Sequence, residues 1–263
     1  MIYFSVIIPT YNSAKTIKNC ISSVLSQKLK NIEIICVDDG SKDRTVEYIK
    51  KFKNKKIKII QKPHSGQPNI NSNLGIKLAK GKYICFLDSD DIWVDPRKLI
   101  IQLNQLRKKN LYSCCTGAFN KKNNRISVYQ NYSKNIISFY DLSLDNIGVH
   151  SSLVVKKNVV KKLNYLSEHK QVSTFYDFDF KIKLSLFSNI AYIPLKTVQY
   201  LDHQKFSNRR RAPVKILMLI TLYQSLKKYF YSSKMYLRFH IYFLMFCILR
   251  ATRLIFSKLI KIF

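Results

Sequence analysis

The chain has 263 residues, of which 47% are hydrophobic, and a formal net charge of +31. That length and apolar content are enough for one large domain with a buried core, and they exclude a disordered chain. So large a positive charge indicates an anionic partner: nucleic acid, acidic lipid headgroups or a phosphorylated small molecule. Charge alone does not choose among these three.

The six cysteines form no CxxC pair and have no histidine partners at zinc-site spacing, and most lie in apolar runs. This usage is typical of reduced thiols, so we expect a cytoplasmic protein. The start of the chain, MIYFSVIIPTYN, lacks the basic residues of a signal peptide. The longest apolar candidate for a membrane span, residues 239–249, is too short and is interrupted by His240, so we expect no transmembrane helix.

Apolar strands alternate with helices along the first ninety residues. Strands are predicted at residues 3–9, 32–41, 56–60 and 83–91, and helices at residues 14–27, 43–52 and 71–81. Short connections between them indicate right-handed crossovers and a mainly parallel sheet, hence an α/β fold. Fully apolar strands such as SVIIP and IEIICV are typical of a sheet that helices cover on both faces.

Three of these strands end in polar clusters, which read TYN, DDGS and DSDD. In parallel α/β sheets, ligands bind outside the carboxyl ends of the strands. The sequence therefore predicts that the three clusters meet at one edge of the sheet and form a binding site there.

Beyond residue 100 the pattern is weaker. An amphipathic helix is predicted at residues 97–110, short strands and loops at residues 111–160, and a Ser/Thr-capped helix at residues 173–187 with Asp177 in its first turn. The final 53 residues hold ten Lys/Arg and no acidic residue. We expect one domain over residues 1–210, with two halves of about 1–110 and 111–210, and a basic amphipathic helical tail over residues 211–263.

Asp88 and Asp90 lie together at the end of the fourth predicted strand. Neighbouring carboxylates repel each other, which raises their pKa values unless a cation is present. A hard divalent ion such as Mg²⁺ or Mn²⁺ takes one or two such carboxylates and completes its shell with water and phosphate oxygens. Helix capping is the alternative; it explains Asp95, before the helix DPRKLIIQL, but not Asp88 and Asp90 together.

The segments VIIPTYN, EIICVDDGSKDRT and GKYICFLDSDDIWVDPRKL, in this order and spacing, resemble family 2 glycosyltransferases of the GT-A fold. The likeness is close over about the first hundred residues and continues in pieces to near residue 208. It implies a Rossmann-type, mainly parallel sheet flanked by helices, with a donor-binding half of about residues 1–110 and an acceptor-binding half of about residues 111–210. It also implies an inverting transfer of a sugar from a nucleotide-sugar donor, with UDP expected as the carrier, to a saccharide acceptor in surface glycan synthesis.

Carried over by position, the resemblance implies a donor site that includes the HSGQ segment, built from Pro9, Thr10, Tyr11, Asn12, Asp39, Gln67, Asp88 and Ser89. Asp39 would accept a hydrogen bond from the base. Asp88 would approach the ribose and the metal, Mn²⁺ or Mg²⁺, and Asp90 would be its direct ligand. Taken singly, Tyr11 and Asn12 are equally typical of a turn, and residues 38–41 of a cap for the next helix.

The resemblance also places a general base in the segment YDFDF. Asp177 takes that position, Tyr176 stands where the family usually has Glu, and Asp179 is the second candidate. A carboxylate there takes the proton of the attacking acceptor hydroxyl. His203, in QYLDHQKFS, matches a late family histidine near the phosphates or metal, although a lone histidine is as often structural.

The basic tail, with Leu, Ile, Phe and Tyr among its cations, is typical of a helix in a membrane interface, and packing against the core is the alternative. We therefore expect a peripheral protein on the inner face of the membrane, with a lipid-linked acceptor. Rival hypotheses are a nucleic-acid-binding or metal-dependent phosphodiester-processing protein, and an inactive membrane scaffold. No nucleic-acid-binding motif is present, so we expect no nucleic-acid partner.

Overall fold

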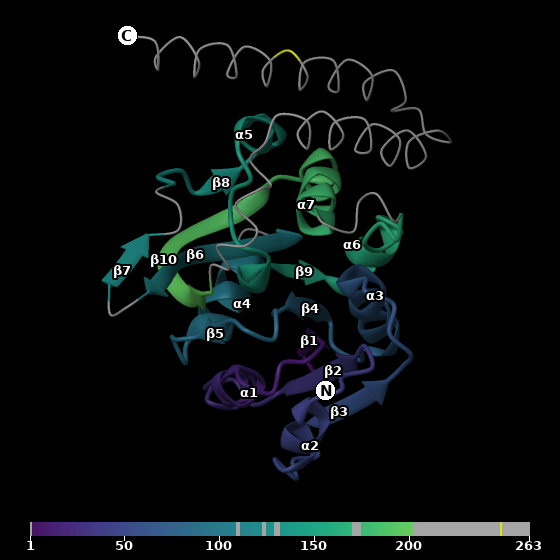
Figure 1. The fold of residues 1–263 in the computed structure, drawn as a ribbon. Coiled ribbons are helices and arrows are strands. Elements are labelled where there is room, and N and C mark those ends of the chain that lie inside the picture. Colours follow the sequence, from purple (N-terminus) through teal and green to yellow (C-terminus); the bar gives the residue numbers. More distant parts are fainter. Residues whose placement is uncertain are drawn as a thin grey trace, which may run out of the picture.

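The computed structural model describes residues 2–108, 111–122, 125–128, 132–169, 175–201 and 248. In this part of the chain the strands form one mixed sheet in the order β3-β2-β1-β4-β9-β6-β10-β5, with β7 paired to β6 and β8 to β10 (Figure 1). Helices lie on both sides of the sheet. The predicted α/β fold with a mainly parallel central sheet is confirmed.

The first half of the sheet is parallel. Its strands are β1 (Phe4–Thr10), β2 (Ile32–Asp38), β3 (Ile57–Gln61) and β4 (Tyr83–Phe86). The helices that connect them are α1 (Ile17–Leu25), α2 (Thr45–Lys50) and α3 (Pro68–Leu78). Every residue of β2 is buried, as predicted for a strand covered on both faces.

The second half mixes strand directions. Its strands are β5 (Ile92–Trp93), β6 (Ser113–Lys122), β7 (Arg125–Val128), β8 (Ile136–Ile137), β9 (Val154–Lys156) and β10 (Ile190–Tyr200). Its helices are α4 (Lys98–Lys108), α5 (Phe139–Leu144), the 3₁₀ turn η1 (His150–Ser152), α6 (Lys157–Lys162) and α7 (Tyr176–Phe187). β9 runs antiparallel to β4 and so joins the two halves into one sheet.

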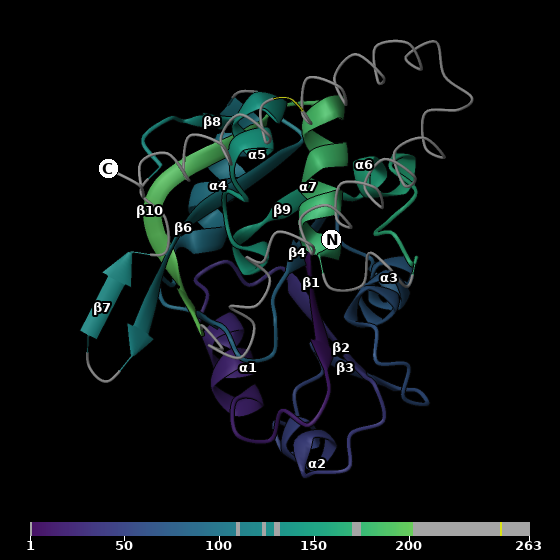
Figure 2. The same cartoon turned by 45° about the horizontal axis from the view of Figure 1, so that its top comes forward.

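Alternation along the strands divides the core into two layers. Ile7 and Ile35 point to the face that α3, α5, α6 and α7 cover. Val6 and Ile34, one residue away on the same strands, point to the face that α1, α2 and α4 cover. Figure 2 shows α7, α6 and α3 on one side of the strands and α1 on the other. Period-two alternation of apolar residues produces this two-layered core.

Several predicted boundaries and one predicted cap differ from the structure. Strand β4 ends at Phe86, so the acidic residues after it lie in a turn. Helix α3 begins at Pro68 rather than residue 71, because proline is well suited to the first helical position. The predicted Ser/Thr cap of α7 is wrong, since Phe175 occupies the cap position and provides no capping oxygen.

Residues 202–247 and 249–263 lie outside the described part of the chain. The predicted domain boundary at residue 210, the amphipathic tail and His203 all fall there. Among the described helices, none combines the length and apolar character that a membrane span requires.

Candidate functional site

The carboxyl ends of β1, β2 and β4 lie side by side at one edge of the sheet. Thr10 faces Asp38 in the parallel register, and the Asp39 amide donates to the Thr10 carbonyl at 2.9 Å. On the other side of β1, the Leu87 amide donates to the Ile7 carbonyl at 3.1 Å, immediately before the acidic turn. The predicted meeting of the three polar clusters is therefore confirmed.

The acidic turn carries Asp88, Ser89 and Asp90, all half-buried. The Ser89 hydroxyl is 2.7 Å from that of Ser13, which follows β1. Beneath the turn, Cys20 donates its thiol hydrogen to the Asp88 carbonyl at 3.5 Å. Burial raises the pKa of this thiol well above its usual value, and the neighbouring carboxylates raise it further. Strong negative potential is thus concentrated at this turn.

The side-chain oxygens of this turn suit a hard divalent cation. Asp88 and Asp90 offer carboxylate oxygens, the ligands that Mg²⁺ and Mn²⁺ prefer. Within the described residues, no group of three or more His, Cys, Asp or Glu is placed to hold a metal. A cation bound by these two aspartates therefore needs water or substrate oxygens to complete its shell.

Asp91, the third acid of the turn, has a structural role. Its side chain is buried and accepts hydrogen bonds from the Ser151 hydroxyl and, at 3.0 Å, from the Leu201 amide. The same Ser151 hydroxyl accepts a hydrogen bond from the Asp88 amide at 3.0 Å. Asp91 thus fixes the acidic turn to η1 and to the end of β10.

The turn after β2 is stabilised by Asp38 and not by a helix cap. Its carboxylate accepts hydrogen bonds from the Ser41 amide at 2.9 Å and from the Thr10 hydroxyl at 3.2 Å.

Asn12 adopts a left-handed backbone (φ 48°) and its side chain accepts a hydrogen bond from the Lys42 amide at 2.9 Å. Asn12 therefore has a structural role in this turn, and its predicted contact with the donor stays a prediction. Asp43, instead of residues 38–41, accepts from the Thr45 amide at the start of α2.

The Asp39 carboxylate is buried and accepts four hydrogen bonds. Its Oδ1 accepts from Lys62 Nζ at 2.6 Å and from the amide and hydroxyl of Ser65 at 3.0 and 2.8 Å; its Oδ2 accepts from the Gly66 amide at 2.9 Å. Burial alone would raise its pKa, but these four donors outweigh burial and lower it to about 2. Asp39 is therefore ionised and rigidly held at neutral pH.

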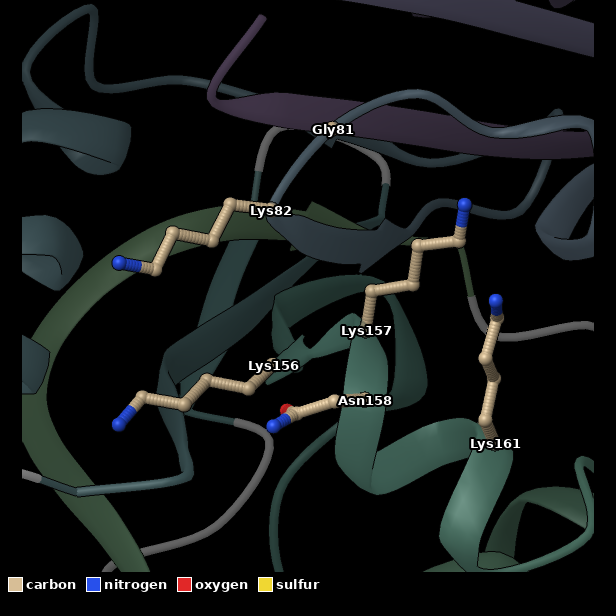
Figure 3. Close-up of a pocket in the computed structure, with 6 residues that line it drawn as sticks. All are labelled: Gly81, Lys82, Lys156, Lys157, Asn158 and Lys161. Carbon is tan, nitrogen blue, oxygen red and sulfur yellow. The ribbon is translucent and has the colours of Figure 1, made fainter.

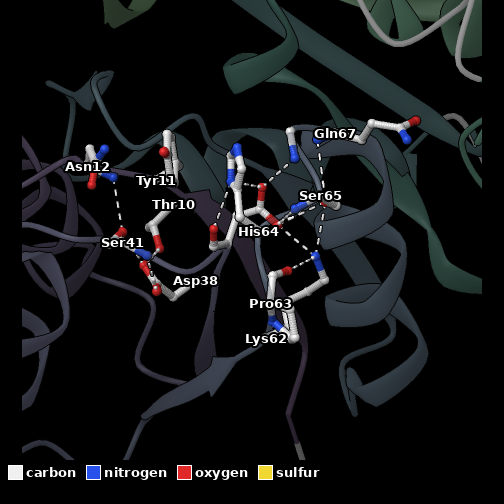
Figure 4. Close-up of polar contacts among 12 residues, drawn as sticks. Thr10, Tyr11, Asn12, Asp38, Ser41, Lys62, Pro63, His64, Ser65 and Gln67 are labelled. Atoms are coloured by element: carbon white, nitrogen blue, oxygen red, sulfur yellow. Dashed lines mark hydrogen bonds and ion pairs between the residues drawn. The ribbon is translucent and has the colours of Figure 1, made fainter.

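Tyr11 and His64 form a ring pair above Asp39. Their rings are stacked with centroids 4.2 Å apart, and His64 Nδ1 donates to the Asp39 carbonyl at 3.0 Å (Figure 4). Gly40, at φ +73°, leaves room for the backbone of this segment, because a Cβ there would lie 3.1 Å from the backbone nitrogen of His64. Gln67 caps α3 without a side-chain hydrogen bond, and its buried Oε1 has no partner among the described residues.

The two carboxylates of YDFDF differ in surroundings. Asp177 lies in the first turn of α7, as predicted, with its side chain 24% exposed and 3.9 Å from Lys181 Nζ. Asp179 is fully buried and pairs with Lys183 at 2.8 Å. An acceptor can reach Asp177 only, so the geometry favours the first candidate over the second.

His150 occupies the space between the acidic turn and α7. Its ring lies 4.3 Å from that of Phe86, at the end of β4, and 5.4 Å from that of Tyr176. Both ring nitrogens are buried without a hydrogen-bond partner among the described residues. Burial lowers its pKa to about 4, against an opposing effect of Asp177. A neutral imidazole therefore lies beside the candidate base at neutral pH.

A separate cavity of about 400 Å³ lies at the opposite, amino end of β4. It is lined by Gly81, Lys82, Lys156, Lys157, Asn158 and Lys161. The ammonium groups of Lys82 and Lys156 extend to one side, and those of Lys157 and Lys161 to the other (Figure 3). No carboxylate lines this cavity, so it is a strongly basic surface distinct from the acidic edge.

Sequence reasoning missed several residues that contact the site, namely Ser13, Lys62, His150 and Ser151. Ser65, by contrast, lies in the HSGQ segment that the resemblance places in the donor site. Lys62 and Ser65 follow β3, whose end lies beside that of β2 in the same parallel sheet. That position was a usable signal, because residues after every parallel strand reach the same edge. No sequence pattern indicated Ser151, since it is 60 residues from its partner Asp91.

Comparison with known proteins gives concordant matches. The family model for Glycosyl transferase family 2 matches residues 5–163. The UDP-Glc:alpha-D-GlcNAc-diphosphoundecaprenol beta-1,3-glucosyltransferase WfgD of Escherichia coli is 32% identical over 168 residues, 64% of this chain and 65% of that protein. This chain therefore covers slightly less than two thirds of that relative.

Two solved structures show the same fold. TarS of S. aureus in complex with UDP-GlcNAc has a TM-score of 0.71 at 21% identity, over 86% of this chain and 67% of that one. The mannosyltransferase PcManGT from Pyrobaculum calidifontis, in complex with GDP-Man and Mn²⁺, has a TM-score of 0.59 at 15% identity, over 88% and 65%. Since the family model covers more than half of the chain and the fold agrees, the chain belongs to glycosyl transferase family 2.

Proposed function

We propose that this chain transfers a sugar from a UDP-sugar to a saccharide acceptor, with inversion, at the edge formed by β1, β2 and β4. The observation that carries the proposal is that Asp39, Asp88 and Asp90 follow strands that end at this edge. Asp177 acts electrostatically on His150, whose ring packs on Phe86 at the end of β4. In support, a relative is named as acting with UDP-Glc and a structural neighbour was solved with UDP-GlcNAc.

Donor binding is assigned to the residues of the first half. The ring of Tyr11 is 42% exposed and offers a face on which a base stacks. The Asp39 carboxylate, which is ionised at neutral pH, would accept a hydrogen bond from a ring N–H of that base. Pro9 and Thr10 end the strand below them, and Ser89 and Gln67 border the same edge.

Asp90 and Asp88 would hold a Mn²⁺ or Mg²⁺ ion on the donor diphosphate. When bound, such an ion neutralises the charge of the departing nucleoside diphosphate. Asp91 and Ser151 hold the backbone of the acidic turn so that both carboxylates stay at the edge. His203, outside the described residues, remains the proposed further ligand.

Asp177 would act as the general base. Its carboxylate takes the proton from the acceptor hydroxyl as that oxygen attacks the anomeric carbon, while the bond to the diphosphate breaks. Asp179 is excluded from this role because it is fully buried against Lys183.

For the acceptor we propose a lipid-linked saccharide at the inner face of the membrane, as an intermediate of surface glycan synthesis. The name of the Escherichia coli relative specifies a diphosphoundecaprenol acceptor. The net charge of +31 and the lysine cavity at the amino end of β4 would favour an anionic membrane surface. None of the matches described above supports the nucleic-acid alternative.

A screen of UDP-, GDP-, dTDP-, ADP- and CMP-sugars by thermal denaturation tests the proposal. A ligand that binds the native state raises the melting temperature. We expect stabilisation by UDP-sugars that requires Mn²⁺ and is abolished by EDTA. Absence of stabilisation by every nucleotide sugar in the presence of Mn²⁺ would overturn the proposed donor site.

A further inference from the structure

His64 belongs to residues 62–67, the segment that joins β3 to α3 at the edge where β1 and β2 end. Its imidazole is stacked on Tyr11 at a centroid distance of 4.2 Å and an interplanar angle of 23°. Its Nδ1 donates to the Asp39 carbonyl at 3.0 Å and also lies 3.0 Å from Asp39 Oδ2. A flat ring with an N–H group thus covers the two side chains assigned above to the donor base.

These contacts are the ones that a nucleobase would make at the same place. A base stacks through its flat face on an aromatic ring and presents a ring N–H to a carboxylate. The face of Tyr11 that the imidazole covers, and the place beside Asp39 Oδ2 that its Nδ1 occupies, cannot serve both rings at once. We propose that His64 occupies the position of the donor base in the free protein and is displaced when the donor binds, an inference that rests on the proposed function.

The surrounding contacts indicate that the side chain alone has to move. Lys62, Ser65 and Gly66 hold the Asp39 carboxylate through backbone and side-chain donors that do not involve the imidazole. The His64 side chain is 50% exposed, so it can rotate into solvent with little loss of packing. The backbone of the segment stays close to Gly40, where only glycine leaves room for it.

If the donor base displaces the imidazole, removal of the imidazole should have an unusual effect on nucleotide binding. A ligand whose site is open in only a fraction of the molecules binds with an apparent affinity reduced by that fraction. Removal of the His64 ring should therefore strengthen nucleotide binding, whereas removal of an ordinary contact residue weakens it. Because a single stacking contact and its hydrogen bond are replaced, the gain should be about tenfold in Kd.

The test compares the wild-type protein with His64→Ala by isothermal titration, using UDP and Mn²⁺ as the probe. His169→Ala, at an exposed histidine elsewhere, is the matched control. Pyrophosphate with Mn²⁺ is the second probe, because it lacks the base. We expect UDP to bind about tenfold more tightly to His64→Ala, while its binding to His169→Ala and the binding of pyrophosphate to all three proteins stay unchanged.

The outcomes separate this inference from the proposed function. Unchanged or weaker UDP binding by His64→Ala, with normal binding by the wild type, overturns the inference alone. Absence of UDP binding by both proteins overturns the donor site and the inference with it. Equal gains for UDP and pyrophosphate also contradict the inference, since the imidazole then does not compete with the base. If His64→Ala melts early, His64→Gln, which keeps a donor but has no ring, is measured instead and should also bind UDP more tightly.

Discussion

At the residue scale, two aspartates in the first turn of α7 show how burial assigns chemical roles. Asp177 and Asp179 are two positions apart, so they point to different sides of the helix. Each has a lysine four residues later, but only the Asp179–Lys183 pair is fully buried and in contact, at 2.8 Å. A carboxylate in such a pair stabilises the helix packing and is out of reach of a substrate.

Substitution of these two aspartates should therefore have opposite effects. Asp177→Asn should lower kcat by on the order of 100-fold or more, the usual contribution of a general base, and leave UDP affinity and melting unchanged. Asp179→Asn leaves Lys183 as an unpaired buried charge and should lower the free energy of unfolding by about 3–5 kcal/mol. Steady-state kinetics and urea denaturation of both variants provide the measurement, and full activity of Asp177→Asn would rule it out as the base.

Asp39 should make the free energy of unfolding depend on pH in the acid range. Its pKa is about 2 in the folded protein and lies near 3.9 in the unfolded chain. A carboxyl group whose pKa is lower in the folded protein stabilises the fold at pH values above its unfolded-state pKa. This contribution is lost as the pH falls through the folded-state pKa. The wild-type free energy of unfolding should thus fall by about 2 kcal/mol between pH 4 and pH 2 on account of this group. In Asp39→Asn this part of the decrease in the free energy of unfolding with falling pH should be absent. An equal decrease in the two proteins would contradict the hydrogen bonds described for Asp39.

At the scale of the elements, β1 and its neighbours were predictable because each is a short apolar run that stops at polar residues. The chain order of those runs also predicted the parallel pairing and hence the shared edge. The contact of Lys62 with Asp39 was not predicted, because Lys62 lies in a segment without periodicity between β3 and α3. Helix α7 was located, but Lys181 and Lys183 are buried in it, against the rule that lysines face solvent. Lys183 pairs with Asp179 in the same helix, but the acceptors of Lys181 are in a distant segment, such as the carbonyl of Gly148, which local pattern does not reveal.

The close approach of β4 and β1 depends on Gly81. A Cβ at this position would lie 2.6 Å from the Ser5 amide nitrogen, and the Gly81 amide itself donates to the Ser5 hydroxyl at 2.8 Å. Gly81→Ala should therefore force the strands apart and lower the free energy of unfolding by about 1–3 kcal/mol. Lys82→Ala, at the exposed neighbour, should change it by less than about 0.5 kcal/mol. Equal stability of the two variants in urea denaturation would show that the strands accommodate the methyl group.

At the scale of the whole molecule, charge is unevenly distributed between the two ends of the parallel strands. Asp38, Asp39, Asp88 and Asp90 gather at the carboxyl edge, and the lysine cavity lies at the amino end of β4. Lys161 lowers the pKa of Lys157, after the larger effect of burial, which shows that cations in this cavity repel one another. An anionic surface that relieved this repulsion would bind there favourably.

Binding of the protein to lipid vesicles should depend on the lysines of this cavity. Vesicles containing phosphatidylserine should bind the protein, neutral vesicles should not, and binding should weaken as salt is raised. Lys82→Gln combined with Lys161→Gln should reduce the partition coefficient by about tenfold or more, since each lysine near such a surface contributes about 1 kcal/mol. Lys15→Gln with Lys42→Gln removes the same charge at the opposite edge and should have little effect. Equal losses for the two pairs would show that binding follows net charge alone.

The central claim is that Asp90 and Asp88 bind a divalent cation that joins the protein to the diphosphate of a nucleotide. Isothermal titration of UDP into the wild-type protein and Asp90→Asn, each with Mn²⁺ and with EDTA, tests this most directly. The account predicts Mn²⁺-dependent binding that Asp90→Asn weakens on the order of 100-fold, because loss of a direct ligand costs at least as much as loss of an outer-shell partner. UDP binding that is the same in EDTA, or the same in Asp90→Asn, would contradict it.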